Sequence, residues 1–148
     1  MRLHRRLILK GTLAFLALTG LPKALFAGAW PQKAFASKGA NEALINLLGT
    51  DQTKPSDKIT LVTPLVAEDG SVVPMSVRTS LSNPLSISIV VENNPRPLVV
   101  SFDLAPEAIP EIAFRIKMAK TSRVLAAVVT DQGVFSTSSE VKVTIGGC

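Results

Sequence analysis

Seven short runs rich in valine, isoleucine, serine and threonine fill most of the chain after its first third. They cover 59–66, 72–81, 85–92, 98–104, 112–119, 124–130 and 134–145. Turn-forming tripeptides separate several of them, at 68–70, 93–95 and 131–133. Apolar and polar residues alternate within the runs, most clearly where Val141, Val143 and Ile145 enclose Lys142 and Thr144. Short alternating strands without intervening helices predict an all-β fold, an immunoglobulin-like antiparallel β-sandwich of about seven strands.

Prolines and phenylalanines refine this prediction. Pro74 and Pro84 lie in or beside predicted strands, and a proline has no N–H to donate to a neighbouring strand. We therefore expect both at a sheet edge or a bulge. Phe102, Phe114 and Phe135 fall on three different strands, and we expect them to point into the core between the two sheets.

The pattern changes over residues 30–49. Apolar residues recur there at steps of three and four, at positions 35, 36, 40, 43, 44, 47 and 48, which predicts one amphipathic helix. Gly49 fits the left-handed position after the last turn. The polar stretch 50–58 contains Pro55 and is predicted to be a connector. An N-terminal helix and connector thus occupy 30–58, and the sandwich occupies 59–145.

Residues 1–29 resemble an export signal. Arg5 and Arg6 begin a charged segment, and an apolar stretch follows from residue 11 to residue 21. As a helix it would span about 16 Å, roughly half the hydrocarbon thickness of a bilayer, so no membrane anchor is expected. The small residues at 27–29 predict cleavage before Trp30, with 34–36 as a second candidate. The paired arginines favour a twin-arginine signal over an ordinary secretory one, and both predict a periplasmic or extracellular location.

Composition excludes several kinds of chemistry. The 148 residues include 16 basic and 11 acidic ones, but five of the basic residues and the single histidine, His4, lie within 1–29. The rest of the chain is formally neutral, which argues against nucleic acid as a partner. Without histidine, tyrosine or a second cysteine, that part offers no catalytic triad and no histidine or cysteine metal site. We expect no catalytic residue and no cofactor.

The single cysteine, Cys148, follows Gly146 and Gly147 directly after the last predicted strand. Two glycines restrict the backbone little, so 146–148 is predicted to be a flexible arm with an exposed thiol, whereas a free cysteine is ordinarily buried. Three residues extend at most about 10 Å, enough to enter a narrow cleft of another protein. The residues alone leave open an incidental cysteine, a disulfide to a second copy, a lipid attachment point and a covalent carrier. If the arm enters an enzyme, valine at either glycine should slow delivery and leave the fold intact.

Three segments give residues 59–148 a resemblance to the SoxY family, the sulfur-carrier subunit of the bacterial thiosulfate-oxidising system. They are EDGSVVP at 68–74, NNPRPL at 93–98 and, most specifically, VKVTIGGC at 141–148. The resemblance implies that Cys148 holds sulfur intermediates covalently and that Gly146 and Gly147 belong to the carrier arm. The family pattern usually has two more glycines after the cysteine, whereas this sequence ends at Cys148. An α-carboxylate on the cysteine itself would disfavour its thiolate.

The resemblance also implies partners. It implies a periplasmic heterodimer with a SoxZ-like sandwich subunit and three enzymes that act on the bound sulfur. These are a haem-containing enzyme that joins thiosulfate to Cys148, a hydrolase that releases sulfate, and a sulfane dehydrogenase that oxidises the remaining sulfur.

Two other classes of function stay open. A periplasmic structural or adhesion module would need no thiol, so Cys148→Ser would have no phenotype. A thiol redox enzyme would need a resolving cysteine or an activated thiol, and the sequence shows neither. The turn at 93–97 is explained by closing a hairpin, with contact to another subunit as the alternative. We therefore rank a non-catalytic carrier first.

Overall fold

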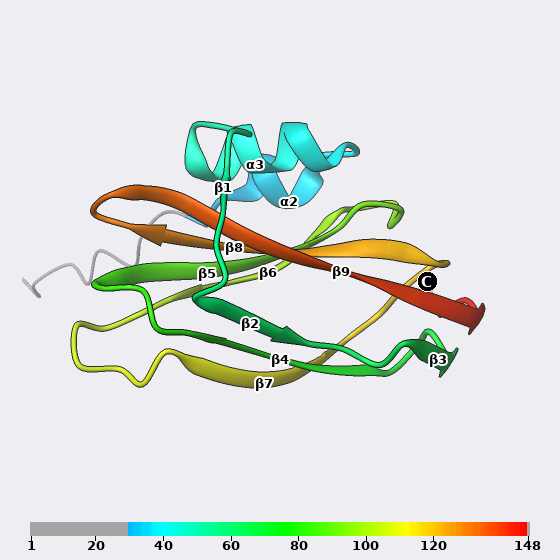
Figure 1. Ribbon diagram of the computed structural model, residues 1–148. Coiled ribbons are helices and arrows are strands. Elements are labelled where there is room, and N and C mark those ends of the chain that lie inside the picture. The colour runs from blue at the N-terminus through cyan, green and yellow to red at the C-terminus, as the bar shows by residue number, and fades with distance from the viewer. Residues whose placement is uncertain (1–29, 148) are drawn as a thin grey trace, which may run out of the picture. The chain divides into compact units, whose positions relative to one another are not determined.

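The computed structural model describes residues 30–147, and half of this range is in strands (Figure 1). The description below concerns the compact unit Pro31–Cys148. The predicted signal sequence and its first cleavage site lie outside the described residues. Within residues 30–147, no helix combines the length and the apolar content needed to cross a membrane.

Two sheets pack face to face. The larger one has six strands. Five follow one another in the order β1 (Lys54–Pro55), β9 (Gly133–Ile145), β8 (Ser122–Thr130), β5 (Pro84–Val91) and β6 (Leu98–Asp103), and β3 (Val66–Asp69) also pairs with β9. The smaller sheet has the order β2 (Ile59–Val62), β4 (Val73–Thr79) and β7 (Glu111–Ile116). The prediction of an all-β sandwich is confirmed.

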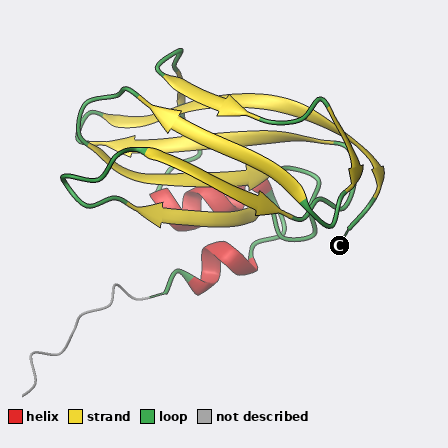
Figure 2. Ribbon diagram, turned by 90° about the horizontal axis from the view of Figure 1, so that it is seen from below, coloured by secondary structure: helices red, strands yellow, loops and turns green. Residues whose placement is uncertain are grey.

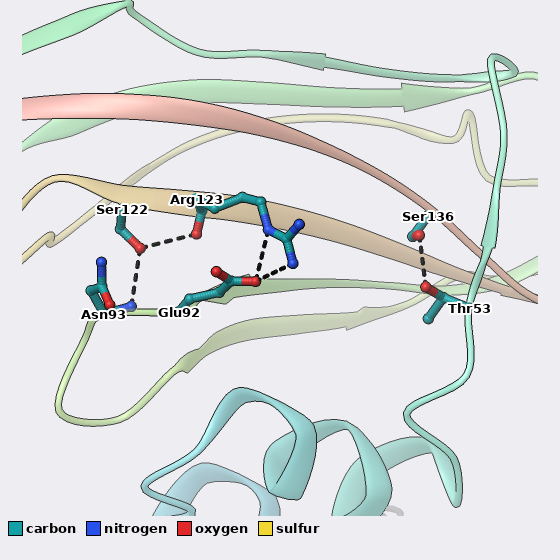
Figure 3. Close-up of polar contacts among 6 residues, drawn as sticks. All are labelled: Thr53, Glu92, Asn93, Ser122, Arg123 and Ser136. Atoms are coloured by element: carbon teal, nitrogen blue, oxygen red, sulfur yellow. Dashed lines mark hydrogen bonds and ion pairs between the residues drawn. The ribbon is translucent and has the colours of Figure 1, made fainter.

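Strand number and direction differ from the expectation of seven antiparallel strands. Pro64 interrupts the predicted strand 59–66, so its first half is β2 in the smaller sheet and the following residues form β3 beside β9. Both β1 and β3 run parallel to β9. The predicted connector 50–58 therefore contains an edge strand, where Pro55 is tolerated. Thr53, just before β1, holds this edge through a 2.8 Å hydrogen bond between its hydroxyl and that of Ser136 (Figure 3).

The core fills the space between the sheets. Ile87 and Ile89 of β5, Val128 of β8, and Val73 and Val77 of β4 are fully buried there. Two of the three phenylalanines, Phe114 and Phe135, pack against this cluster. The half-buried Phe102 lies 5.6 Å from Phe114, ring centroid to centroid, and links β6 to β7 across the two sheets.

Both prolines lie at strand positions where the missing N–H costs little strand pairing. Pro84 begins β5, where the register with β8 shifts. Pro74 lies on the central strand of the smaller sheet, but β2 pairs with β4 only as far as Ser76. At Pro74 the strand has a neighbour on one side only, so the missing N–H removes no bond to β2.

Two helices, α2 (Gln32–Ala36) and α3 (Ala40–Leu48), cover the outer face of the larger sheet (Figure 1). Their Ala34 and Leu44 pack with Val90 and Leu98 of that sheet. The prediction of one continuous helix is wrong. Ser37 has an extended backbone and its hydroxyl donates to the Lys33 carbonyl (2.9 Å), so the chain leaves the helix there and begins again after Gly39. Gly49 ends α3 with φ 76°, as predicted.

Candidate functional site

Strand β9 carries the chain from the core to the edge of the sandwich. It pairs antiparallel with β8 as far as Val141, which lies opposite Ser122 and is fully buried. Beyond this point β8 ends, and β9 pairs in parallel with β3, with Ala67 opposite Val143. Ile145, the last residue of β9, is 67% exposed. Figure 2 shows this end of the chain beside the loops at one end of the sheets.

Backbone hydrogen bonds hold the residues after β9. The Gly70 N–H donates to the Ile145 carbonyl (2.7 Å), and the Met118 N–H donates to the Gly70 carbonyl (2.7 Å). The Gly147 N–H in turn donates to the Met118 carbonyl (3.0 Å). Three segments distant in sequence, 70–71, 118–119 and 145–147, are thereby joined main chain to main chain. We call these segments the backbone clamp.

Glycine is required inside the clamp because the chains approach so closely. A Cβ atom on Gly147 would overlap the Ser71 nitrogen and the Gly70 carbonyl carbon. One on Gly146 would overlap the Ala119 carbonyl oxygen. One on Gly70 would overlap the Met118 carbonyl oxygen and lie 2.9 Å from the Gly147 nitrogen. The absence of side chains therefore allows the three backbones to meet.

The sequence predicted a flexible arm over 146–148. In the described part of that segment, Gly146 and Gly147 are packed against other backbone segments, and Gly147 is hydrogen-bonded. Valine at either position has no room unless the clamp moves, so we now expect valine to displace this end of the chain, while its effect on the rest of the fold stays a prediction. Local sequence shows the conformational freedom of glycine but not the distant backbone it packs against. Cys148, the predicted attachment residue, lies outside the described residues.

The loop that supplies Met118 is itself fixed from the core side. The Met118 side chain is fully buried. Asn94 is buried too, accepts the Ala119 N–H at Oδ1 (2.9 Å) and donates from Nδ2 to the Lys117 carbonyl (2.8 Å). Asn94 therefore positions the carbonyl that receives Gly147. Sequence analysis missed the role of Asn94. The available signal was that the turn 93–95 contains two asparagines, although Asn93 and Pro95 already suffice to form a turn.

Further polar contacts attach the β7–β8 loop and the start of β8 to neighbouring segments. The Asn93 N–H donates to the Ser122 hydroxyl (3.0 Å), which donates to the Arg123 carbonyl (Figure 3). The Arg123 side chain in turn forms an ion pair with Glu92, with Nε donating to a carboxylate oxygen at 2.8 Å. On the arm side, the Val143 N–H donates to the Thr121 hydroxyl (3.0 Å). The β7–β8 loop is therefore held on both sides.

The turn from β3 into the clamp carries a titratable group. The Ser71 N–H donates to the Asp69 carboxylate (2.8 Å). This bond, followed by one from the Ser71 hydroxyl, holds the pKa of Asp69 below its ordinary value of 3.8. The ionised carboxylate therefore favours the turn that places Gly70.

The described part of the site is built mainly from backbone groups. Within residues 30–147, no three histidine, cysteine, aspartate or glutamate side chains gather closely enough to hold a metal ion. The residues around the clamp contribute mainly backbone amides and carbonyls that are already paired with one another. What the geometry provides is a fixed exit point for the residue that follows Gly147.

Comparison with known proteins decides the family. Residues 44–148 match the family of the sulfur oxidation protein SoxY. The chain belongs to the SoxY family. This confirms the resemblance found from the sequence, and the matched range includes all three segments of the clamp.

Solved structures agree with this assignment. SoxY, the sulfur carrier protein from Chlorobium limicola f thiosulfatophilum, is 36% identical over 70% of this chain and 94% of its own, with a TM-score of 0.64. A superoxide reductase (neelaredoxin) from Ignicoccus hospitalis is 15% identical over 62% of this chain and 94% of its own, with a TM-score of 0.55, which shows a shared fold alone. No curated protein matches the chain.

Proposed function

We propose that this SoxY-family chain is a sulfur carrier, and that Cys148 holds thiosulfate-derived intermediates covalently while other proteins act on them. The proposal rests on the place where the chain leaves the sandwich. The clamp fixes Gly147 at the edge of the sandwich, and the only cysteine of the sequence comes next. The Chlorobium protein, whose structure this chain resembles along most of its length, is a sulfur carrier, which supports the same role.

All steps of the proposed chemistry take place on the sulfur of Cys148 or on the sulfur bound to it. In the first step, the Cys148 thiol and thiosulfate form an S–S bond, which releases one proton and two electrons to a haem-containing partner. In the second, water cleaves the bond between the outer sulfur and the sulfonate, which gives hydrogen sulfate and leaves a persulfide on Cys148. A sulfane dehydrogenase would then oxidise that sulfur. This chain supplies only the nucleophile.

The composition of the chain supports a non-catalytic role. Apart from His4, there is no histidine, and there is no tyrosine anywhere. General acid–base catalysis at neutral pH depends most often on histidine. The acid–base steps of the cycle are therefore assigned to the partner enzymes.

The partners proposed are a SoxZ-like sandwich subunit and the three enzymes of the cycle, in the periplasm after export through the signal at 1–29. Apolar side chains beside the exit point support docking at this end of the molecule. Ile145, the last residue of β9, is 67% exposed, and Val72, which follows Ser71 of the clamp, is 53% exposed. Exposed apolar residues grouped around a functional residue favour protein contact.

The test is thiosulfate oxidation by the reconstituted partner proteins. Cys148→Ser is expected to abolish turnover, because a serine hydroxyl does not form the S–S bond. Thr144→Ser, an equally conservative change on exposed β9 surface, is the matched control and should turn over as wild type. Turnover by Cys148→Ser would contradict the proposal and support a structural module instead.

A further inference from the structure

We propose that Gly70, which lies outside the arm, is the positioning residue that sets where the fixed chain ends and the movable arm begins. With the clamp closed, Gly147 is held by its hydrogen bond to the Met118 carbonyl, and Cys148 follows it in the sequence. An enzyme that takes in more than Cys148 must first break the bond between Gly147 and Met118. The consequence for sulfur delivery rests on the proposed function, whereas the clamp itself does not.

Gly70 lies at the centre of the clamp. Its N–H and its carbonyl are both engaged, the first with Ile145 and the second with Met118. A Cβ atom at this position would overlap the Met118 carbonyl oxygen, which is the atom that accepts the Gly147 N–H. Any side chain at position 70 would therefore push apart the two groups whose hydrogen bond holds the arm.

Backbone conformation does not explain the glycine at this position. Among the described glycines, only Gly49 and Gly133 have a positive φ, so Gly70 has a backbone that other residues can adopt. Gly70 is also not part of the segment 146–148 that is proposed to enter an enzyme. The close approach of the Met118 and Gly147 backbones is the remaining requirement.

The decisive variant is Gly70→Ala, with Gly39→Ala as the matched control. A Cβ at Gly39 meets nothing closer than the Glu42 Cβ at 3.9 Å. The measurement is hydrogen exchange of the Gly147 amide, followed by NMR on the mature chain. Wild type and Gly39→Ala should protect this amide at least about tenfold relative to an unstructured peptide, and Gly70→Ala should lose that protection. The amide of Val128 in β8 should stay protected in all three proteins.

A spin label on Cys148 separates positioning from general stability. If Gly70→Ala releases the arm, the lines of the nitroxide EPR spectrum should narrow. The midpoint temperature of thermal unfolding should change little. If Gly70→Ala also exposes the Val128 amide, Gly147→Ala decides, since its Cβ is excluded by Ser71 without a change in β3. Loss of protection at position 147 then supports the role of the clamp.

Two results would overturn this inference. One is a Gly147 amide in wild type that exchanges as fast as in the free peptide. The other is retained protection at position 147 in Gly70→Ala or, if that variant exposes the Val128 amide, in Gly147→Ala. Neither measurement requires sulfur chemistry or a partner enzyme. Failure of the clamp would therefore leave Cys148 as the proposed carrier residue, and failure of the carrier role would leave the clamp unaffected.

Discussion

The two halves of β9 are attached to the molecule in different ways. From Gly133 to Val141 the strand pairs with β8, with β1 on its other side at Phe135 and Ser136, and buried side chains such as Ser136 and Val141 anchor it. From Lys142 onward the side chains are mostly exposed, and hydrogen bonds from the backbone to Gly70, Met118 and Thr121 hold the chain. Buried side chains therefore attach the first half to the core, whereas the second half is attached mainly through backbone hydrogen bonds, with Val143 its one side chain packed against the core.

Met118→Ala should have the largest effect, because Met118 belongs to both kinds of attachment. Its side chain is fully buried in the core, and truncation of a buried methionine costs about 2–5 kcal/mol. The backbone carbonyl that accepts Gly147 remains. Urea denaturation should show this loss, with Gly147 protection reduced only as far as global stability falls. A loss below about 1 kcal/mol would show that the loop is not anchored through the core.

Asn94→Ala should have the next largest effect. It leaves the Ala119 N–H without its acceptor and removes the donor to Lys117, at a cost of about 1–3 kcal/mol in the free energy of unfolding. Asn93→Ala is the matched control, because that exposed side chain makes one bond, to the Thr121 carbonyl, which water can replace. Equal losses measured by denaturation for the two variants would contradict a special role of Asn94.

Thr53→Val tests the anchored half of β9. It removes the hydroxyl that bonds Ser136 while keeping the size of the side chain, and should cost about 0.5–1.5 kcal/mol. Thr60→Val, at an exposed position of β2, should change stability less. Hydrogen exchange should become faster at the Ser56 amide, which donates to the Ser136 carbonyl of β9, and stay unchanged at Gly147. Faster exchange at Gly147 would mean that the two halves are coupled.

Acidification should have the smallest effect, and it should fall on the clamp half. The pKa of Asp69 is lowered by its bonds from Ser71, so the ionised carboxylate stabilises the turn at pH values above 3.8. This contribution is lost as the pH falls through the lower pKa of the folded state. Gly147 protection in wild type should therefore weaken below pH 3.8, whereas Asp69→Asn should lack this step. Identical pH profiles, measured by amide exchange, would exclude Asp69 as the titrating group.

The sequence predicted what depends on local pattern. Alternation of Val141, Val143 and Ile145 predicted the last strand, and Gly49 predicted the end of a helix. The parallel pairing of β3 could not be predicted, because it depends on where the chain crosses after Pro64. The clamp was missed for the same reason, since Gly70, Met118 and Gly147 form a site only through contacts between distant segments. Asn94 looked like a turn residue because its partners lie more than twenty positions away.

The measurement that tests carriage of sulfur most directly is the intact mass of this chain isolated from cells of its source organism grown on thiosulfate. We predict that a fraction carries thiosulfonate or persulfide sulfur, that fragmentation places it on Cys148, and that Cys148→Ser carries none. An unmodified Cys148 under every growth condition, in cells that oxidise thiosulfate, would contradict the proposal.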